Sequence, residues 1–308
     1  MTARSKLNIL RSSLDESANL IDLTEGIETR VVHRPGKTII YVSSQTGCVQ
    51  GCQMCWLTHN KGSSKSPRNL TVAETLAQVR QAYTSEAPQR LPKEHKLYVD
   101  FMAKGEPLAN PHLLAEGDKI ANALAQLFEN RPWRMNVSSI LPKKFLASGH
   151  GQSPPSWLLR PEVRLYWSWY SEDPDFRAEW LPASPRYTDV LWDFMHSLAD
   201  ARGDKTLNLH RALISQPNST SQQPRGENSS PSNLAELCQR LTELPQGLRA
   251  KINLVHLNPP QGTSWEEASP ETLDLWLRTP VQHPRVTSAV LKERVGFDVY
   301  ASCGMFAT

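Results

Sequence analysis

Short apolar runs rich in β-branched residues recur along the chain, with amphipathic segments between them. Six of these runs have the length and composition of buried strands: 38–42, 97–102, 134–139, 163–169, 207–214 and 251–257. Runs of this kind, when they alternate with helical segments, favour a parallel sheet.

The segments between these runs carry helical spacing. The clearest begins with a capping box, Thr71 to Glu74, after which Leu76, Val79 and Tyr83 continue along one helical face. Further helices are expected to begin near four positions: Leu113, Tyr187, Leu234 and Glu271. The alternation predicts an α/β fold, and an open (β/α)6 partial barrel fits it as well as a doubly wound sheet does. Both place chemistry at the carboxyl ends of the strands.

Two connectors interrupt the pattern. Residues 215–233 are rich in Ser, Gln, Asn and Pro, which predicts an exposed loop that contributes nothing to a core. Residues 147–161 form a similar connector around Trp157. Because the strand–helix rhythm resumes after each connector, we expect one large domain rather than two.

Composition fits an enzyme of a reducing, cytoplasmic compartment without a membrane anchor. The 308 residues include five cysteines, and neither a signal peptide nor an apolar run of 18 residues is present. The formal charge of +3 permits a nucleic-acid partner without indicating one.

Three of the cysteines share one short segment. Cys48, Cys52 and Cys55 have the spacing CxxxCxxC, which is typical of an iron-sulfur cluster that leaves one iron open. Structural zinc prefers two separated ligand pairs, and the remaining Cys238 and Cys303 have no partner at such a spacing. A [4Fe-4S] cluster is therefore expected, with zinc or three buried thiols as the alternatives.

A cysteine motif that holds a cluster with one open iron resembles that of the radical S-adenosylmethionine (SAM) superfamily. In that superfamily the cluster binds and cleaves SAM. The residue before the third cysteine is usually aromatic in that superfamily, and here it is Met54. A thioether can fill the same apolar space beside the cluster.

The rest of the chain resembles one family within it, the RlmN/Cfr methyltransferases, which methylate C2 or C8 of an adenosine in RNA. The matching segments occur in family order: Glu28-Thr29, 42–45, 68–70, 105–107, 251–254, Asn258-Pro259 and 301–304. The resemblance implies a partial (β/α)6 TIM-like barrel, a [4Fe-4S] cluster, SAM, a ribosomal or transfer RNA substrate, and an electron donor such as a flavodoxin-type reductant.

The resemblance also implies a set of SAM contacts. A glycine at a strand end lets the backbone approach a ligand, and a carboxylate pairs with an amino group. The residues implied are Gly105, Glu106, Ser138, Ser168, Trp169, Tyr170 and Asn258. At Trp169 and Tyr170 the chain departs from the family, which has a small residue and a histidine there.

Cys303 matches the family's methyl-carrying cysteine, and Glu28 matches a carboxylate that handles protons and holds the adenine edge. Tyr41 stands where the family has a second catalytic cysteine, which forms a disulfide with the carrier and frees the product. Because a phenol can form no disulfide and is a weaker acid than a thiol, either product release uses another route or an RNA adduct is not the normal intermediate.

The expected domain organisation is a short extension, 1–27, followed by a radical SAM core with the carrier segment, 28–308. Family members carry a helical accessory domain before the core, so the RNA substrate is less strongly implied than the chemistry. Cations such as Lys61, Lys65 and Lys143 could contact phosphate. The alternatives are a relative that acts on a nucleotide, DNA base or small molecule, and a cluster-binding protein without turnover.

Overall fold

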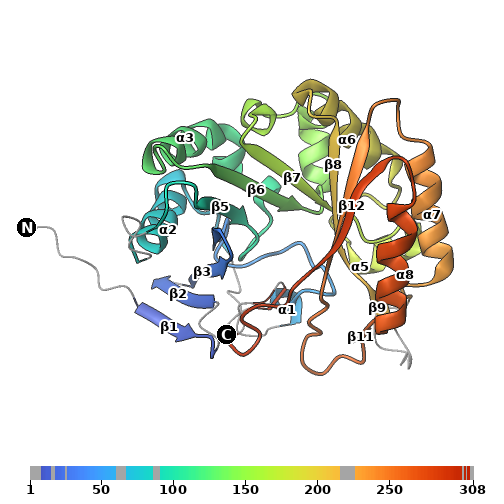
Figure 1. Cartoon of the computed structure of the whole chain (residues 1–308), viewed down its shortest axis with the longest axis horizontal. Helices are drawn as coiled ribbons and strands as arrows, with labels where there is room; N and C mark the ends of the chain where they lie inside the picture. The colour runs from blue at the N-terminus through green and yellow to red at the C-terminus, as the bar shows by residue number, and fades with distance from the viewer. Residues whose placement is uncertain are drawn as a thin grey trace, which may run out of the picture.

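A curved ten-stranded sheet forms the centre of the computed structural model, which describes residues 8–14, 18–24, 26–59, 67–85, 91–215, 226–299, 302, 304 and 305. Seven neighbouring strands run parallel and wrap into a partial barrel (Figure 1). They are β4 (Lys37–Tyr41), β5 (Lys96–Phe101), β6 (Trp133–Ser139), β7 (Val163–Ser168), β8 (Thr206–Ala212), β10 (Arg249–Val255) and β12 (Val286–Lys292). The predicted partial barrel and all six predicted strands are confirmed, and β12 is an additional strand.

Three antiparallel strands extend the sheet at its amino-terminal edge: β1 (Asn8–Ser12), β2 (Ala18–Thr24) and β3 (Ile27–Arg34). The predicted extension, 1–27, thus lies partly in strands that continue the core sheet. A separate small sheet pairs β9 (Ile214–Ser215) with β11 (Glu266–Glu267).

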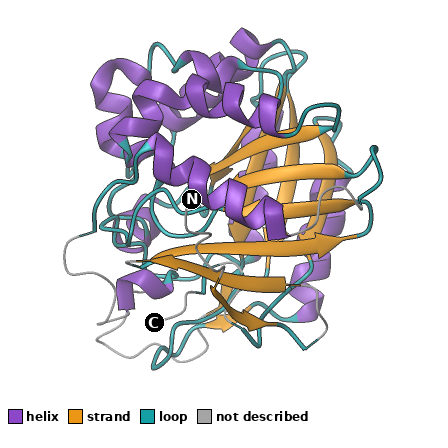
Figure 2. Ribbon diagram, turned by 90° about the vertical axis from the view of Figure 1, so that its left-hand side faces the viewer, coloured by secondary structure: helices purple, strands orange, loops and turns teal. Residues whose placement is uncertain are grey.

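Helices cover the outer face of the sheet, as Figures 1 and 2 show. The longer ones are α2 (Val72–Ser85), α3 (Pro111–Leu127), α5 (Pro174–Trp180), α6 (Asp189–Arg202), α7 (Pro231–Thr242) and α8 (Pro270–Val281). The shorter helical segments are α1 (Trp56–His59), η2 (Pro107–Ala109), α4 (Lys143–Phe145), η3 (Leu146–His150) and η4 (Ser156–Leu159). No described helix is both long and apolar enough to cross a bilayer.

Local sequence sets where these helices begin. The predicted capping box of α2 is present, because Thr71 N–H donates to Glu74 Oε2 at 2.9 Å and Glu74 N–H donates to Thr71 Oγ1 at 3.3 Å. Four other helices start with a polar cap followed directly by proline, whose fixed φ suits the first helical position. The caps are Asn110, Asp173, Ser230 and Ser269.

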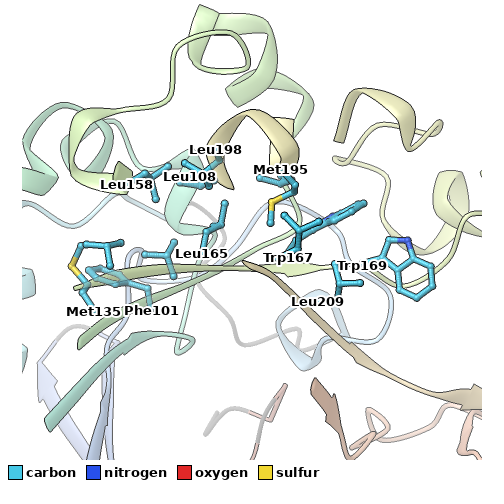
Figure 3. Close-up of a cluster of buried hydrophobic side chains, with 14 of the residues drawn as sticks. Phe101, Leu108, Met135, Leu158, Leu165, Trp167, Trp169, Met195, Leu198 and Leu209 are labelled. Carbon is cyan, nitrogen blue, oxygen red and sulfur yellow. The ribbon is translucent and has the colours of Figure 1, made fainter. Parts of the chain in front are cut away.

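The hydrophobic core lies between the sheet and the helices. Figure 3 shows Leu165 and Trp167 of β7 close to Met195 of α6, and the Trp167 and Trp192 rings meet edge to face at 4.9 Å. Alternate residues of the same strands face the concave side, where polar side chains line the barrel interior.

The segment after β12 returns across the open side of the barrel. Glu293 pairs with Arg34 of β3, and Val295 and Val299 pack with Val32 and Ile39. The carboxyl-terminal part of the chain is thereby brought to β3, β4 and the cysteine segment.

The expectation that 215–233 contributes nothing to the core is wrong for its described end. Asn228 is fully buried and donates from Nδ2 to the carbonyls of Tyr170 and Ala212, at 3.0 and 3.1 Å. The second connector is also ordered around a buried Trp157, whose ring occupies the space that a side chain at Gly117 would need. Composition alone does not reveal that single buried side chains anchor both connectors.

Candidate functional site

The cysteine segment follows β4 at the carboxyl edge of the barrel. Cys48, Cys52 and Cys55 are all half-buried, and Cys55 N–H donates to the Cys52 carbonyl at 3.1 Å. Burial raises the pKa of the Cys48 thiol to about 12 and that of Cys52 well above its usual range, and the three sulfurs disfavour one another's negative charge. Such a site holds thiolates only if a metal centre compensates their charge.

Within the described ranges, no three His, Cys, Asp or Glu side chains converge tightly enough to hold a single metal ion. The three thiols are nevertheless near enough to affect one another's ionisation. A cube of iron and sulfide takes its thiolates at separate corners, so this arrangement suits a cluster better than a mononuclear zinc site.

Gly105 and Glu106 lie at the end of β5, beside the cysteines. A Cβ on Gly105, whose φ is +102°, would lie 2.6 Å from Ser44 Oγ and 2.7 Å from Gln45 Cβ, so no other residue fits without a shift. The Glu106 carboxylate is buried and accepts from the N–H groups of Leu108 and Ile140, at 3.0 and 3.1 Å. Burial raises its pKa to about 7, and its charge reaches Cys48 and Cys52.

The other residues that were predicted to contact SAM differ in their burial and in the side chains around them. Ser138, in β6, lies 3.2 Å from His210 Nδ1, and Ser168 is half-buried at the end of β7. Trp169 is 1% exposed, packs in the core with the Arg211 guanidinium 4.5 Å from its ring centre, and donates its indole N–H to Glu172. Any ligand contact from Trp169 would therefore come from its backbone. Tyr170 packs in the same apolar cluster as Cys52.

A cavity of about 180 Å³ occupies the barrel interior. Asn258, after β10, lines it and is buried, and its carbonyl accepts the Trp56 indole N–H at 2.9 Å. Tyr41 lines the same cavity from the end of β4.

Polar residues that the sequence analysis did not single out line this cavity more deeply. Asn136 Nδ2 donates to Asp100 Oδ1 at 2.6 Å, and burial raises the pKa of Asp100 to about 7. Burial also lowers the pKa of His210 to about 4, which keeps its ring neutral. In the sequence, these polar residues stand at alternate positions of largely apolar strands. This pattern could have indicated that they face the barrel interior.

Glu28 lies in β3 with a buried carboxylate. Its Oε1 accepts from Arg30 Nε at 2.8 Å, and its Oε2 lies 3.5 Å from Lys104 Nζ. Arg30 also donates to the carbonyls of Ser302 and Met305. The sequence analysis missed Arg30, although its position two residues after Glu28 places both on the same face of the strand.

Cys303 lies outside the described residues, as do Lys61 and Lys65, but Cys303's described neighbours dock on the cysteine segment. Trp56 N–H donates to the Gly304 carbonyl at 3.2 Å, and the buried Met305 packs in one cluster with Trp56, Cys48 and Cys55. The structure thus brings together, from distant parts of the chain, the three cysteines, Glu106, and the residues on either side of Cys303.

Comparison with known proteins agrees with this geometry, although no family model matches the chain. The probable dual-specificity RNA methyltransferase RlmN of Corynebacterium efficiens is 26% identical over 286 residues, covering 91% of this chain and 69% of that protein. The probable RlmN of Parafrankia sp. is 29% identical, covering 91% and 68%. A radical SAM methyltransferase structure from Sphaerobacter thermophilus, 24% identical, superposes with a TM-score of 0.72 over 97% of this chain and 80% of that one.

The relatives align with nine-tenths of the chain, and the solved structure shares its partial barrel. The chain is thus similar over nine-tenths of its length to proteins named RlmN RNA methyltransferases, and it shares the fold of a radical SAM methyltransferase.

Proposed function

We propose that this protein is a radical SAM methyltransferase that methylates C2 or C8 of an adenosine in RNA through a methyl group carried on Cys303. The observation that carries the proposal is the docking of Gly304 and Met305 on the cysteine segment. It brings the neighbours of Cys303 next to the thiols that would hold the cluster. The names of the relatives, RNA methyltransferases, support the substrate class.

Cys48, Cys52 and Cys55 would hold the [4Fe-4S] cluster. Gly105 has no room for a Cβ beside Ser44 and Gln45, so it would fix the close-packed backbone from which Glu106 is presented to SAM. When bound and reduced by an external electron donor, the cluster with SAM would supply a 5′-deoxyadenosyl radical. Glu106, Ser138, Ser168, Tyr170, Asn258 and the backbone of Trp169 would position the cosubstrate.

The carrier role of Cys303 requires two SAM molecules for each product. The Cys303 thiol first gives up a proton and accepts a methyl group. Transfer of one hydrogen atom from that S-methyl group to the 5′-deoxyadenosyl radical, which forms 5′-deoxyadenosine, would leave a carbon radical that bonds to the adenine ring, so two of the three original hydrogens would remain. Glu28, with its charge held by Arg30 and Lys104, would help to move the proton that the ring loses.

Product release must cleave the bond between the Cys303 sulfur and the transferred carbon. Tyr41 lines the cavity and pairs with Arg30 across β3 and β4, so it lies beside the carrier segment. Because a phenol cannot form a disulfide, we propose that the covalent RNA adduct persists unless another thiol intervenes.

The experiment that tests the proposal compares RNA nucleosides, by mass spectrometry, from cells with and without this chain. We expect the native chain, but not Cys303→Ala, to give an adenosine that carries the transferred carbon, either as methyladenosine where a cellular thiol releases it or as an adduct with the Cys303 peptide. In vitro, 5′-deoxyadenosine should form from SAM with the anaerobically reconstituted protein. Unchanged nucleosides together with 5′-deoxyadenosine formation would point to another substrate.

A smaller substrate is the second candidate, and a buried polar pair on the cavity wall favours it. Asp100 and Asn136 both line the cavity of about 180 Å³, and Asn136 Nδ2 donates to Asp100 Oδ1. These groups suit a nucleotide base whose edge carries both hydrogen-bond donors and acceptors. Methylation of a free nucleotide, with RNA unmodified in the same assay, would favour this candidate.

A further inference from the structure

Arg30 is a buried cation, 2% exposed, at the centre of a contact set that links β3 to the carboxyl-terminal segment. On one side, its Nε and Nη2 donate to Glu28 Oε1 at 2.8 and 2.5 Å. On the other, its Nη1 donates to the Ser302 carbonyl at 3.0 Å and its Nη2 donates to the Met305 carbonyl. One guanidinium therefore reaches the backbone both before and after Cys303.

The two carbonyls that Arg30 contacts belong to one tight turn. Met305 N–H donates back to the Ser302 carbonyl at 3.2 Å, and Gly304 takes a positive φ of +78°. Ser302 Oγ also donates to the Val295 carbonyl at 2.9 Å. Arg30 contacts both ends of the turn through the two terminal nitrogens of its planar guanidinium group. These two bonds fix the orientation of the turn as well as its position.

Glu28 is in turn placed between two cations. Lys104 Nζ lies 3.5 Å from Glu28 Oε2 and donates to the Gly26 carbonyl at 3.2 Å, while Arg30 takes Oε1. A carboxylate that bonds a guanidinium from one side fixes the plane of that guanidinium.

We propose that Arg30 is the positioning residue for the methyl carrier, and that Glu28 orients Arg30. In this arrangement Arg30 holds the backbone at Ser302 and Met305, on either side of Cys303, next to the segment that carries Cys48 and Cys55. The inference rests on the proposed function for the carrier role of Cys303, but the docking of the turn can be measured without catalysis.

The planar fork of arginine is what the role needs. Lysine retains the charge but offers one ammonium centre, which cannot span Glu28 and both carbonyls in the same geometry. The turn keeps its other contacts to Trp56 and Val295, so losing the fork should loosen the turn without unfolding the barrel.

The test compares Arg30→Lys with Arg160→Lys, a matched control far from the turn. Arg160 also pairs with a glutamate two residues away, through bonds of 2.9 and 2.7 Å to Glu162. Amide hydrogen exchange of the metal-free chain measures the docking of the peptide that contains Ser302 to Met305. Peptide mass spectrometry of protein reconstituted with SAM measures methylation at Cys303.

We expect Arg30→Lys to speed exchange of the carboxyl-terminal peptide about tenfold, because charge-assisted bonds to both carbonyls are weakened. Cys303 methylation should slow by about the same factor, while bound iron, the melting temperature and 5′-deoxyadenosine formation stay at the native level. Arg160→Lys should match the native chain in the exchange and methylation measurements.

Two results would overturn the inference: native exchange and methylation in Arg30→Lys, or a parallel loss of iron, thermal stability and SAM cleavage, which would mean a general structural role. If the native chain never carries a methyl group on Cys303 while the exchange effect persists, the positioning of the turn by Arg30 stands and the proposed carrier chemistry fails.

Discussion

Gly105 shows how one residue of the site is constrained by the backbone around it. Its φ is +102°, and a Cβ there would overlap both Ser44 and Gln45. Gly36 also has a positive φ, +71°, but a Cβ at that position would meet no atom within 4 Å. Replacing Gly36 by alanine therefore costs stability through backbone conformation alone. The pair therefore separates close packing from backbone strain.

Gly105→Ala is expected to lower the free energy of unfolding by about 2–4 kcal/mol, and Gly36→Ala by about 1–2 kcal/mol. Denaturant titration of the two variants measures the difference. Equal losses would mean that the backbone at Gly105 can shift away from Ser44 and Gln45 at little cost.

Asp100 predicts a pH dependence of stability. Burial raises its pKa from 3.8 to about 7, so the folded state holds the proton more tightly than the unfolded state. Its contribution is therefore most favourable below about pH 4 and is lost as the pH rises through about 7. Lys37 and Lys292 oppose the shift only in part.

Asp100→Asn keeps an acceptor for Asn136 and removes the titration. Relative to the native chain, the variant should gain roughly 2–3 kcal/mol of unfolding free energy between pH 5 and pH 8. Urea titrations at the two pH values measure this, and His210 contributes equally to both proteins. A constant difference across the range would place the ionised carboxylate in a better-solvated site than its burial indicates.

At the scale of elements, the sequence predicted those strands and helix starts that depend on residues close together in the chain. The six predicted strands are short runs in which apolar residues recur at about every second position or more often, and the α2 capping box is formed within four residues. The strand β12 was not predicted from the sequence, because its residues are only partly buried or exposed. The link from Arg30 to Ser302 joins residues 272 positions apart, and a single sequence carries no signal for such a contact.

The cysteine segment is the element that defines the chemistry. We expect replacement of Cys48, Cys52 and Cys55 together by alanine to abolish bound iron and sulfide and, with them, SAM cleavage. Cys238→Ala is the control, because Cys238 lies in α7, where it packs against the hydrophobic core. Iron and sulfide analysis after anaerobic reconstitution checks this. Stoichiometric iron in the triple variant would reject the ligand assignment.

Taken as a whole, the molecule folds its described carboxyl-terminal segment, as far as Met305, back onto β3 and β4. Residues of β3 and β4 and Ser302 line the cavity, while Met305 of the same turn packs with Cys48 and Cys55. The sequence motifs predicted the members of this group, but only the three-dimensional structure shows that Arg30 connects them. Tyr41 lies within the group, where its chemistry bears on release.

Tyr41→Cys is expected to convert a single-turnover protein into one that releases product, because a thiol near the carrier can form the disulfide that frees the transferred carbon. The native chain should accumulate a covalent RNA adduct on a denaturing gel. Tyr41→Phe is the matched control and should behave like the native chain. Multiple turnovers by native protein whose Cys303 is never modified would show that transfer takes another route.

Transfer through a methyl group on Cys303 that loses one hydrogen atom leaves an isotopic signature in the product. The reconstituted protein is incubated with RNA and SAM whose methyl group carries three deuteriums, and digested nucleosides and the covalent adduct are analysed by mass spectrometry. We expect the transferred carbon on adenosine to retain two deuteriums, and Cys303→Ala to yield none. A methyladenosine that retains all three would contradict transfer through the carrier, because the methyl group would then have passed intact from SAM to the base.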